Sequence, residues 1–238
     1  MYLFDGRIRY SEVDSEGKLT LASLINYFQD CSTFQSEDLH VGLQYMAEQH
    51  LVWVVSSWQI IVERLPMQGE YVQVGTKPYE FNQFMGLRNF AMLTKSGQYL
   101  AKANSVWSLL NTDTWKPALP PEAMRKAYVL SDRLNMVYAP RKIAVPEGGS
   151  DREGIVIKKH HLDTNNHVNN GQYVEMALEY LPEDFVLKQL RVEYKMQTLL
   201  DEVLIPHVAE ETQTVTVALN GQDGRPHAVI EFAKEVAQ

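Results

Sequence analysis

The chain has 238 residues, of which 45% are apolar and 10% aromatic, and its formal net charge is −8. This composition is sufficient for one large hydrophobic core or two smaller ones, and it excludes a disordered chain. The acidic balance argues against a nucleic-acid-binding protein, because neutralising phosphates requires a basic surface.

Neither a membrane segment nor a cofactor site is expected from the sequence. No stretch reaches the roughly 18 to 20 apolar residues that a membrane span requires, and the first residues lack the pattern of a signal peptide. We therefore expect a cytoplasmic protein with no membrane partner. The single Cys31 excludes a disulfide framework and a cysteine-rich metal site. No metal cluster, phosphate loop or nucleotide fingerprint is visible, so we expect no metal and no cofactor.

The first predicted element is a long helix that begins at Thr20. Threonine is a typical N-cap residue, and the apolar residues that follow recur at three- and four-residue spacings on one face. These residues are Leu21, Leu24, Ile25, Phe28, Cys31 and Phe34. We expect this face to be buried, with Cys31 as a small apolar core residue.

Four strands are predicted after this helix. Residues 51–63, 70–77, 84–94 and 100–111 are rich in β-branched and aromatic side chains, and turn signals such as Lys95-Ser96-Gly97 separate them. Residues 112–154 are rich in proline, glycine and basic side chains, which indicates a connection between domains. The positive charges in it and just beyond it include Arg125, Lys126, Arg133, Arg141, Lys142, Lys158 and Lys159. On charge alone, a solvated linker is somewhat favoured over a docking surface.

A second helix and four more strands follow a very polar stretch, HLDTNNHVNNGQY at residues 161–173. Asn169 or Asn170 is the expected N-cap of this helix. Its apolar stripe consists of Tyr173, Val174, Ala177, Leu178 and Leu181. Strands are predicted at residues 189–195, 202–210, 214–220 and 228–235, the last two joined by a glycine-rich turn.

The two halves of the chain resemble each other. Residues 13–25 align with residues 162–174 at an offset of 149, and residues 58–72 align with residues 190–204 at an offset of 132. The first copy thus has 17 more residues between the two matches, in and around residues 31–51. These extra residues are equally consistent with a cover over an apolar channel and with a surface loop.

A helix followed by antiparallel strands, twice, predicts an α+β fold of two tandem hotdog modules. In each module a curved antiparallel sheet wraps around one long apolar helix. We place the modules at residues 1–111 and 155–238, with a linker at residues 112–154.

The polar stretch of the second copy holds the candidate catalytic groups. If residues 163–167 are extended, the side chains of Asp163, Asn165 and His167 project to one side, about 7 Å apart in succession. An imidazole that accepts a proton from water, a carboxylate that orients it and an amide that holds an oxyanion are the parts needed to hydrolyse an acyl derivative. The first copy has glutamate and lysine in place of the amide and imidazole. An ordinary helix cap beside a surface histidine is the alternative interpretation.

Residues 162–182, LDTNNHVNNGQYVEMALEYLP, resemble the LDxNxHVNNxxY signature of the acyl-acyl-carrier-protein (acyl-ACP) thioesterases. Residues 51–76, 103–125 and 190–197 are also similar to blocks of that family. The resemblance implies that Asp163 and His167 activate water and that Asn165 holds the thioester oxygen. It also implies that acyl carrier protein is the partner.

One block departs from the family pattern. Where the family often reads LEYRREC, this chain reads VEYKMQT, with Gln197 at the glutamate and Thr198 at the cysteine. A cysteine nucleophile is therefore excluded at this place. A glutamine cannot act as a base, but it forms hydrogen bonds, so we expect Gln197 to position water or His167 during direct attack by water.

The resemblance also gives expectations for substrate and partner binding. The acyl-chain pocket is expected in residues 1–111, with Trp53, Trp58, Met85 and Trp107 as lining, and with Met46, Phe81 and Phe84 as further candidates. The acidic carrier is expected to dock on Arg125, Lys126, Arg141, Lys142, Lys158 and Lys159. An acyl-coenzyme A thioesterase and a non-catalytic acyl-binding protein are the alternatives. A monomer and a homodimer are equally compatible with the sequence.

Overall fold

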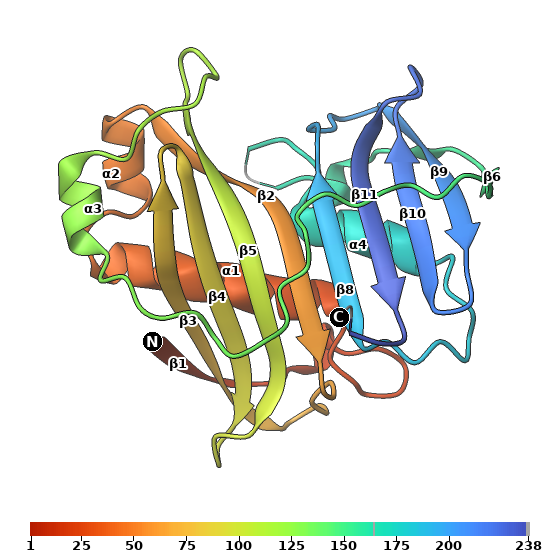
Figure 1. The fold of residues 1–238 in the computed structure, drawn as a ribbon, viewed down its shortest axis with the longest axis horizontal. Coiled ribbons are helices and arrows are strands. Elements are labelled where there is room, and N and C mark those ends of the chain that lie inside the picture. Colours follow the sequence, from red (N-terminus) through yellow and green to blue (C-terminus); the bar gives the residue numbers. More distant parts are fainter. Residues whose placement is uncertain (164, 237–238) are drawn as a thin grey trace. The chain divides into compact units, whose positions relative to one another are not determined.

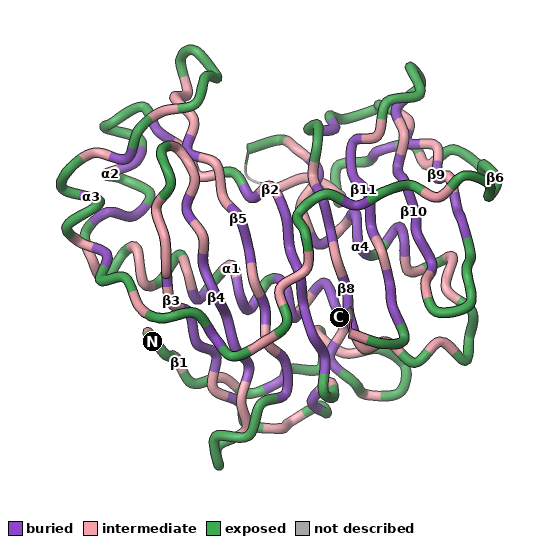
Figure 2. The backbone as a smooth tube through the Cα atoms, in the orientation of Figure 1, coloured by how far each residue is buried: buried purple, intermediate pink, exposed green. Residues whose placement is uncertain are grey.

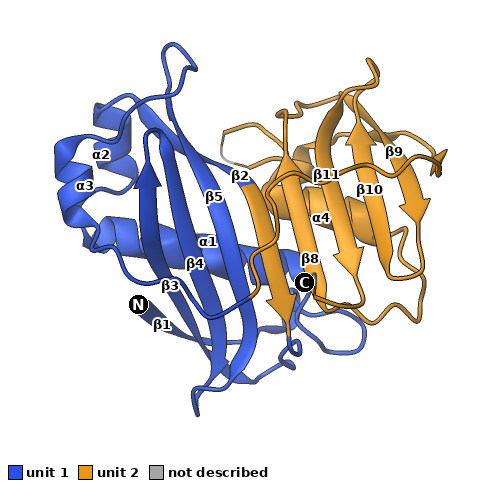
Figure 3. Ribbon diagram, in the orientation of Figure 1, with its two compact units in different colours: residues 1–56, 63–136 blue, residues 57–62, 137–238 orange. Residues whose placement is uncertain are grey.

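The computed structural model describes residues 1–163 and 165–236, and it consists of two compact units (Figures 1 and 3). Unit 1 comprises residues 1–56 and 63–136, and unit 2 comprises residues 57–62 and 137–238. Strand β2 (Leu51–Val62) is shared, because its first half belongs to unit 1 and its second half to unit 2. Each unit combines helices with an antiparallel sheet, so the predicted α+β class is confirmed.

Unit 1 is an antiparallel sheet with a long helix against it. Strand β1 is the sheet edge, β3, β4 and β5 follow, and β2 lies beside β5. The elements in chain order are β1 (Tyr2–Arg7), the 3-10 helix η1 (Tyr10–Glu12), α1 (Leu21–Asp38), α2 (Leu43–Glu48), β2, β3 (Tyr71–Asn82), β4 (Met85–Thr94), β5 (Tyr99–Asn111) and α3 (Glu122–Ala127). The ring centroids of Phe28 in α1 and Phe90 in β4 are 5.3 Å apart, so this helix packs directly on the sheet.

Helix α1 begins where the sequence predicts. The N–H of Ser23 donates to Thr20 Oγ1 at 3.1 Å, which is the expected N-cap. The predicted stripe is buried from Leu21 to Cys31, and burial raises the pKa of the Cys31 thiol to about 12. Phe34 departs from the prediction, since it is 45% exposed and packs edge-on against Phe4 of the edge strand β1.

The extra residues of the first copy form the last turns of α1 and the short helix α2. Met46 of α2 lies in a buried apolar cluster with residues that follow β5. The buried members of this cluster are Val41, Met46, Leu51, Leu109, Met124 and Tyr128. The extra segment is therefore a packed part of unit 1 and not a surface loop.

Unit 2 repeats the plan of unit 1 with shorter elements. Its strands lie in the order β2, β8, β11, β10, β9, β6, and β7 also pairs with β9. The elements are β6 (Ser150–Asp151), β7 (Ile155–Val156), the 3-10 helix η2 (Lys159–His161), α4 (Asn170–Leu178), β8 (Gln189–Tyr194), β9 (Val203–Glu210), β10 (Thr214–Asn220) and β11 (Pro226–Ala233). Helix α4 ends three residues before Leu181, which the sequence placed in the helical stripe. The buried residues of the strands form the interior of each unit (Figure 2).

The repeat in the sequence is also a repeat in hydrogen bonding. In unit 1 the N–H of Ile8 donates to the carbonyl of Glu70 at 3.0 Å, and in unit 2 the N–H of Ile157 donates to the carbonyl of Glu202 at 2.9 Å. The donors are 149 positions apart and the acceptors 132, which are the two offsets of the sequence match. Both units also join their strands in the same way, with β3, β4, β5 and β2 in unit 1 matching β9, β10, β11 and β8 in unit 2.

Residues 137–143, which we call the strap, are held to the sheet of unit 2 by three polar side chains. Gln59 of β2 forms hydrogen bonds with the backbone of residues 137 and 139, and Arg191 of β8 donates to the carbonyls of residues 140 and 142. Glu193 accepts from the N–H of residue 143. Gln59 and Glu193 are buried. The segment is thus an ordered strap across two strands, although its composition predicts a solvated linker.

Two kinds of feature are absent from the described residues. None of the described helices combines the length and the apolar character that crossing a membrane requires. Among the same residues, no group of three or more histidine, cysteine or acidic side chains is arranged to hold a metal ion.

Candidate active site

Three of the four predicted catalytic residues, Asp163, Asn165 and His167, lie in a closed turn between η2 and α4. The N–H of Asp163 donates to the carbonyl of His167 at 2.8 Å, and the N–H of Asn166 donates to the carbonyl of Asp163 at 3.1 Å. Asn166 has a φ of 60°, in the left-handed region that asparagine tolerates better than most residues. The prediction of an extended row is therefore wrong, because this residue folds the chain back on itself.

The carboxylate of Asp163 holds this turn together. Its Oδ1 accepts hydrogen bonds from the N–H groups of Asn165 at 2.8 Å and His167 at 3.2 Å. Asp163 and His167 are half-buried, whereas Asn165 is exposed. One carboxylate oxygen thus positions the backbone of both other candidate residues.

Unit 1 contains a turn with the same hydrogen bonds but with different side chains. Oδ1 of Asp14 accepts from the N–H groups of Glu16 and Lys18, both at 2.9 Å. These two residues stand where unit 2 has Asn165 and His167, and their side chains form an ion pair of 2.6 Å. The aspartate is therefore a structural element of both turns, and only the turn of unit 2 carries an amide and an imidazole.

The turn of unit 2 leads directly into the N-terminus of α4. The side chain of Asn169 accepts from the N–H of Gly171 at 2.8 Å, so Asn169 is the N-cap. The positive end of the helix dipole therefore lies next to the turn, where it favours developing negative charge.

A second segment of unit 2 lies beside the turn. The N–H of Val168, the residue after the turn, donates to the carbonyl of Thr198 at 3.0 Å. Gln197 directly precedes Thr198, so its backbone lies near the turn. Gln197 is exposed, as a group that contacts substrate or water must be.

Thr198 is fully buried, and its hydroxyl joins two other buried side chains. It accepts a hydrogen bond from the Tyr173 hydroxyl at 2.9 Å and lies 2.6 Å from His227 Nδ1. Burial raises the pKa of Tyr173 to about 12, so its hydroxyl stays protonated and donates. Nothing in the sequence indicates this series of hydrogen bonds, because Thr198 is 25 positions from Tyr173 and 29 positions from His227.

His161 fixes the start of the site. Its Nδ1 accepts from the N–H of Lys158 at 3.0 Å, and its carbonyl accepts from the N–H of Asn169. Burial and the neighbouring His160, whose ring centroid is 4.1 Å away, lower the pKa of His161 and favour its neutral form. A neutral ring is required for this acceptor role.

The predicted acyl-chain residues are divided between the units. Trp53, Met85 and Trp107 are half-buried residues of unit 1, whereas Trp58 is buried in the half of β2 that belongs to unit 2. Trp53 stacks on Phe81, with ring centroids 6.2 Å apart. The Trp107 indole donates to Ser105 Oγ at 2.7 Å.

The six predicted docking cations are all exposed. Arg125 and Lys126 belong to α3 in unit 1, where Lys126 pairs with Glu122 at 2.7 Å. The other four are in unit 2, with Arg141 and Lys142 in the strap. Lys158 and Lys159 lie at η2, immediately before the turn that carries the candidate catalytic residues.

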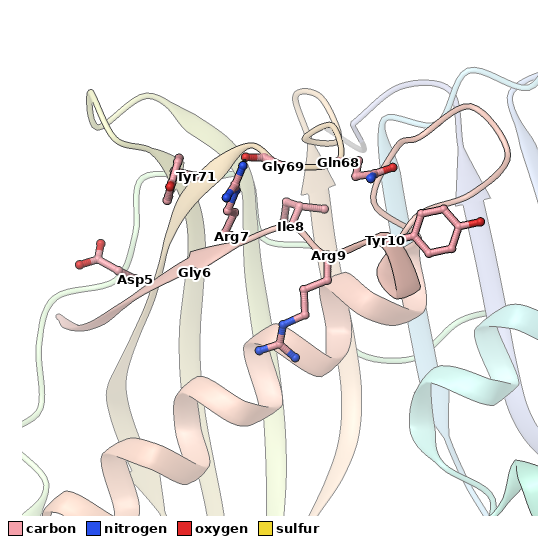
Figure 4. Close-up of a pocket in the computed structure, with 9 residues that line it drawn as sticks. All are labelled: Asp5, Gly6, Arg7, Ile8, Arg9, Tyr10, Gln68, Gly69 and Tyr71. Atoms are coloured by element: carbon pink, nitrogen blue, oxygen red, sulfur yellow. The ribbon is translucent and has the colours of Figure 1, made fainter.

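An open groove of about 630 Å³ lies elsewhere, along β1 and the start of β3 in unit 1 (Figure 4). Arg7, Arg9 and Tyr71 contribute to its lining. It contains none of the predicted catalytic or acyl-chain residues.

Comparison with solved structures identifies the fold. A crystal structure of an acyl-ACP thioesterase from Bacteroides thetaiotaomicron superposes with a TM-score of 0.89 at 23% identity, over 97% of this chain and 96% of that one. The 12:0-ACP thioesterase from Umbellularia californica gives a TM-score of 0.82 at 20% identity, over 98% and 96%. The fold is therefore the one that these thioesterases share.

Family models identify the chain more specifically. The acyl-ACP thioesterase N-terminal domain matches residues 4–128, and the C-terminal domain of the same family matches residues 147–236. The chain belongs to the acyl-ACP thioesterase family.

Curated relatives agree with this assignment. A chloroplastic acyl-[acyl-carrier-protein] hydrolase of Cuphea viscosissima is 28% identical over 213 residues, which are 83% of this chain and 52% of that protein. The palmitoyl-ACP thioesterase of Arabidopsis thaliana is 26% identical over 215 residues, with the same two shares. This chain spans about half the length of the curated relatives it matches.

A shorter protein matches only part of the chain. A 1,4-dihydroxy-2-naphthoyl-CoA thioesterase from Synechocystis gives a TM-score of 0.50 at 13% identity, over 53% of this chain and 93% of that one. Nearly the whole of that protein thus corresponds to about half of this chain.

Proposed function

We propose that the chain is a thioester hydrolase that releases fatty acids from acyl carrier protein. The observation that carries this proposal is the turn of unit 2, in which a member of the acyl-ACP thioesterase family retains aspartate, asparagine and histidine at the start of α4. The substrates named for the relatives, acyl groups on acyl carrier protein, agree with it.

In the proposed reaction, water attacks the thioester carbonyl carbon directly. The neutral imidazole of His167 accepts one proton from this water, and the side-chain amide of Asn165 donates a hydrogen bond to the carbonyl oxygen as it becomes negative. The carbon–sulfur bond then breaks, and the proton passes from His167 to the departing thiolate of the carrier. The products are a free fatty acid and the carrier thiol.

The other residues of the site have supporting roles in this proposal. Asp163 fixes the backbone of the turn through Oδ1, which leaves Oδ2 to orient the imidazolium or water. Gln197 positions the attacking water through its amide. Thr198 is not a nucleophile, because a hydroxyl with no exposed surface cannot reach a carrier-bound thioester.

We further propose that residues 1–111 and 155–238 are tandem hotdog modules, connected by residues 112–154. The repeated strand order and the repeated hydrogen bonds at the two sequence offsets support this interpretation. The shorter Synechocystis thioesterase supports it as well, since it corresponds to one half of the chain. In this proposal the first module binds the acyl chain and the second carries out hydrolysis.

The first test is hydrolysis of acyl-ACP with detection of the released thiol. The wild-type protein is expected to hydrolyse acyl-ACP, and the His167→Ala variant is expected to lose roughly 100- to 10,000-fold in kcat, because general base catalysis contributes that much. The same acyl groups on coenzyme A serve as the comparison. Faster hydrolysis of acyl-coenzyme A than of acyl-ACP would identify coenzyme A as the carrier of the substrate. Binding of acyl-ACP without turnover would identify the chain as an acyl-binding protein. An acylated enzyme trapped in a single turnover would overturn the direct attack by water.

The second test concerns the docking of the acidic carrier next to the catalytic turn. Charge reversal in the double variant Lys158→Glu/Lys159→Glu is expected to raise KM for acyl-ACP about tenfold and to leave KM for a small uncharged thioester unchanged, since only the carrier meets these cations. Because both side chains are exposed, the fold is expected to be retained. Equal effects on the two substrates would mean that the lysines are only solvated surface.

A further inference from the structure

His227 of β11 holds residues 195–198 through both its backbone and its side chain. Its carbonyl accepts hydrogen bonds from the N–H groups of the first two of these residues, at 2.8 and 3.1 Å. Its Nδ1 lies 2.6 Å from the hydroxyl oxygen of the last one, Thr198. Gln197 lies between these attachment points. The residue expected to position the attacking water is therefore on a segment that His227 fixes at both ends.

The side-chain bond of His227 is part of a buried series with a defined direction. The hydroxyl of Tyr173, in α4, donates to Thr198 Oγ1 at 2.9 Å. The hydrogen of the threonine is thus available to His227 Nδ1, which accepts it when the ring is neutral. All three side chains are buried, and a buried network whose members are all satisfied makes its surroundings rigid. The segment that contains Gln197 is therefore held from α4 on one side and from β11 on the other.

Unit 1 has the same backbone hydrogen bonds without any polar side chain. The carbonyl of Leu100 accepts from the N–H groups of residues 63 and 64, at 3.0 and 3.3 Å, as the carbonyl of His227 does from residues 195 and 196. The carbonyl of Pro66 accepts from the N–H of Leu19 at 2.9 Å. This bond matches the one from Val168 to Thr198, at the same two sequence offsets.

Each member of the polar series thus has an apolar counterpart in unit 1. Leu24, Pro66 and Leu100 stand where unit 2 has Tyr173, Thr198 and His227, and all three are buried. Since the backbone bonds form with these apolar residues, a polar series is not needed to fold the segment. It occurs in the unit that carries the candidate catalytic residues, which points to a role in the site.

The exchange of proline for threonine changes what Gln197 can do. The ring of Pro66 fixes its own φ near about −65° and also restricts the residue before it. Thr198 imposes neither restriction on Gln197. Hydrogen bonds from Tyr173 and His227 then replace the proline ring as the means of holding the segment in place.

We propose that His227 is a positioning residue that, through Thr198, holds Gln197 in its working position. This inference rests on the proposed function, because it assumes that Gln197 positions the attacking water. His227 is buried and acts through the segment, without touching the substrate. Without its side-chain bond, Thr198 and Gln197 are free to shift, and a displacement of about 1 Å at a catalytic group lowers turnover by up to roughly 100-fold.

The first experiment replaces His227 with the residue that unit 1 has in its place. His227→Leu is expected to lower kcat for acyl-ACP by roughly 10- to 100-fold and to leave KM unchanged, because the positioning of water is altered and no proposed binding residue is. His227→Asn keeps an acceptor near the position of Nδ1 and is expected to retain most of the wild-type kcat.

His207 of β9 provides the matched control in the same unit. Its ring forms hydrogen bonds with Asp151 and with the carbonyl of residue 148, and none with residues 195–198 is among the bonds described. His207→Leu is therefore expected to retain the wild-type kcat. An equal loss in His207→Leu and His227→Leu would contradict a specific role for His227.

A double-mutant cycle with Gln197→Ala separates positioning from a general effect on stability. If His227 acts through Gln197, His227→Leu changes kcat by less than about twofold once Gln197 is already alanine. A loss of the same size with and without Gln197 overturns the inference. If His227→Leu does not fold, Thr198→Val removes the same hydrogen bond and takes its place in the cycle.

The mobility of Gln197 gives a readout that does not depend on turnover. Its backbone N–H signal in nuclear magnetic resonance spectra is assigned by its loss in Gln197→Ala. We expect an order parameter of about 0.85 in the wild-type protein and in His227→Asn, and a fall towards about 0.6 in His227→Leu or Thr198→Val. Unchanged order parameters in all variants overturn the inference even in an active thioesterase. A wild-type protein that hydrolyses no acyl-ACP contradicts the proposed function instead, while the expected loss of order would still support the hold of His227 on Gln197.

Discussion

At the scale of single residues, Thr198 shows how a site can keep its geometry while its chemistry changes. The resemblance to the thioesterase family places a cysteine at this position, and here a threonine links Tyr173 and His227 in the interior. Its carbonyl also accepts from the N–H of Val168, next to His167. The residue thus connects the buried interior of unit 2 to the turn that carries the candidate catalytic residues.

Replacing this hydroxyl is expected to destabilise the protein. Thr198→Val has nearly the same shape but leaves Tyr173 and His227 each without a buried hydrogen-bond partner, which costs about 1–3 kcal/mol for each group. We expect the free energy of unfolding, measured by chemical denaturation, to fall by roughly 2–6 kcal/mol. Thr198→Ser keeps the hydroxyl and is expected to lose only about 1 kcal/mol for the missing methyl group. Equal losses in the two variants would contradict a structural role for the hydrogen bonds.

At the scale of elements, the sequence predicts the helices and strands that are long and have a periodic apolar pattern. The start of α1 at Leu21 and eight strands follow from apolar spacing and turn residues. The helices α2 and α3 have six residues each, too few for a periodic stripe, and β1 alternates only between half-buried and exposed positions. Such short or edge elements are fixed by tertiary packing, which local sequence does not encode.

The strap of unit 2 illustrates the same limit. Composition at residues 137–143 predicts a solvated linker, but Gln59 and Glu193 hold its backbone through side chains that lie 50 or more positions away. The sequence does not indicate which distant residue a polar side chain within a strand will hydrogen-bond to. Their burial in the structure indicates that residues 137–143 belong to the fold of unit 2.

At the scale of the whole chain, the two similar turns distinguish what supports the candidate site from what the proposed reaction requires. The choice of Asp163, Asn165 and His167 as candidate site residues could be made from the sequence, but the closed turn that holds them could not be predicted. The closed turn depends on the left-handed conformation of Asn166, which the pattern of side chains in the sequence does not predict. The matching turn at Asp14 has the same backbone hydrogen bonds and no imidazole, so the chain contains its own control.

This internal control allows the two roles of Asp163 to be measured separately. Asparagine keeps the Oδ1 acceptor that both turns use but removes the negative charge. Asp14→Asn and Asp163→Asn are therefore both expected to change the free energy of unfolding by less than about 0.5 kcal/mol. Only Asp163→Asn is expected to lower kcat for acyl-ACP, by roughly 100-fold, because the carboxylate that orients and stabilises the His167 imidazolium is lost. Steady-state hydrolysis and chemical denaturation of the same two preparations provide both quantities. If Asp163→Asn retains nearly all of its turnover while remaining folded, the aspartate acts through the turn alone, as Asp14 does, and the proton chemistry must then rest on His167 without a carboxylate.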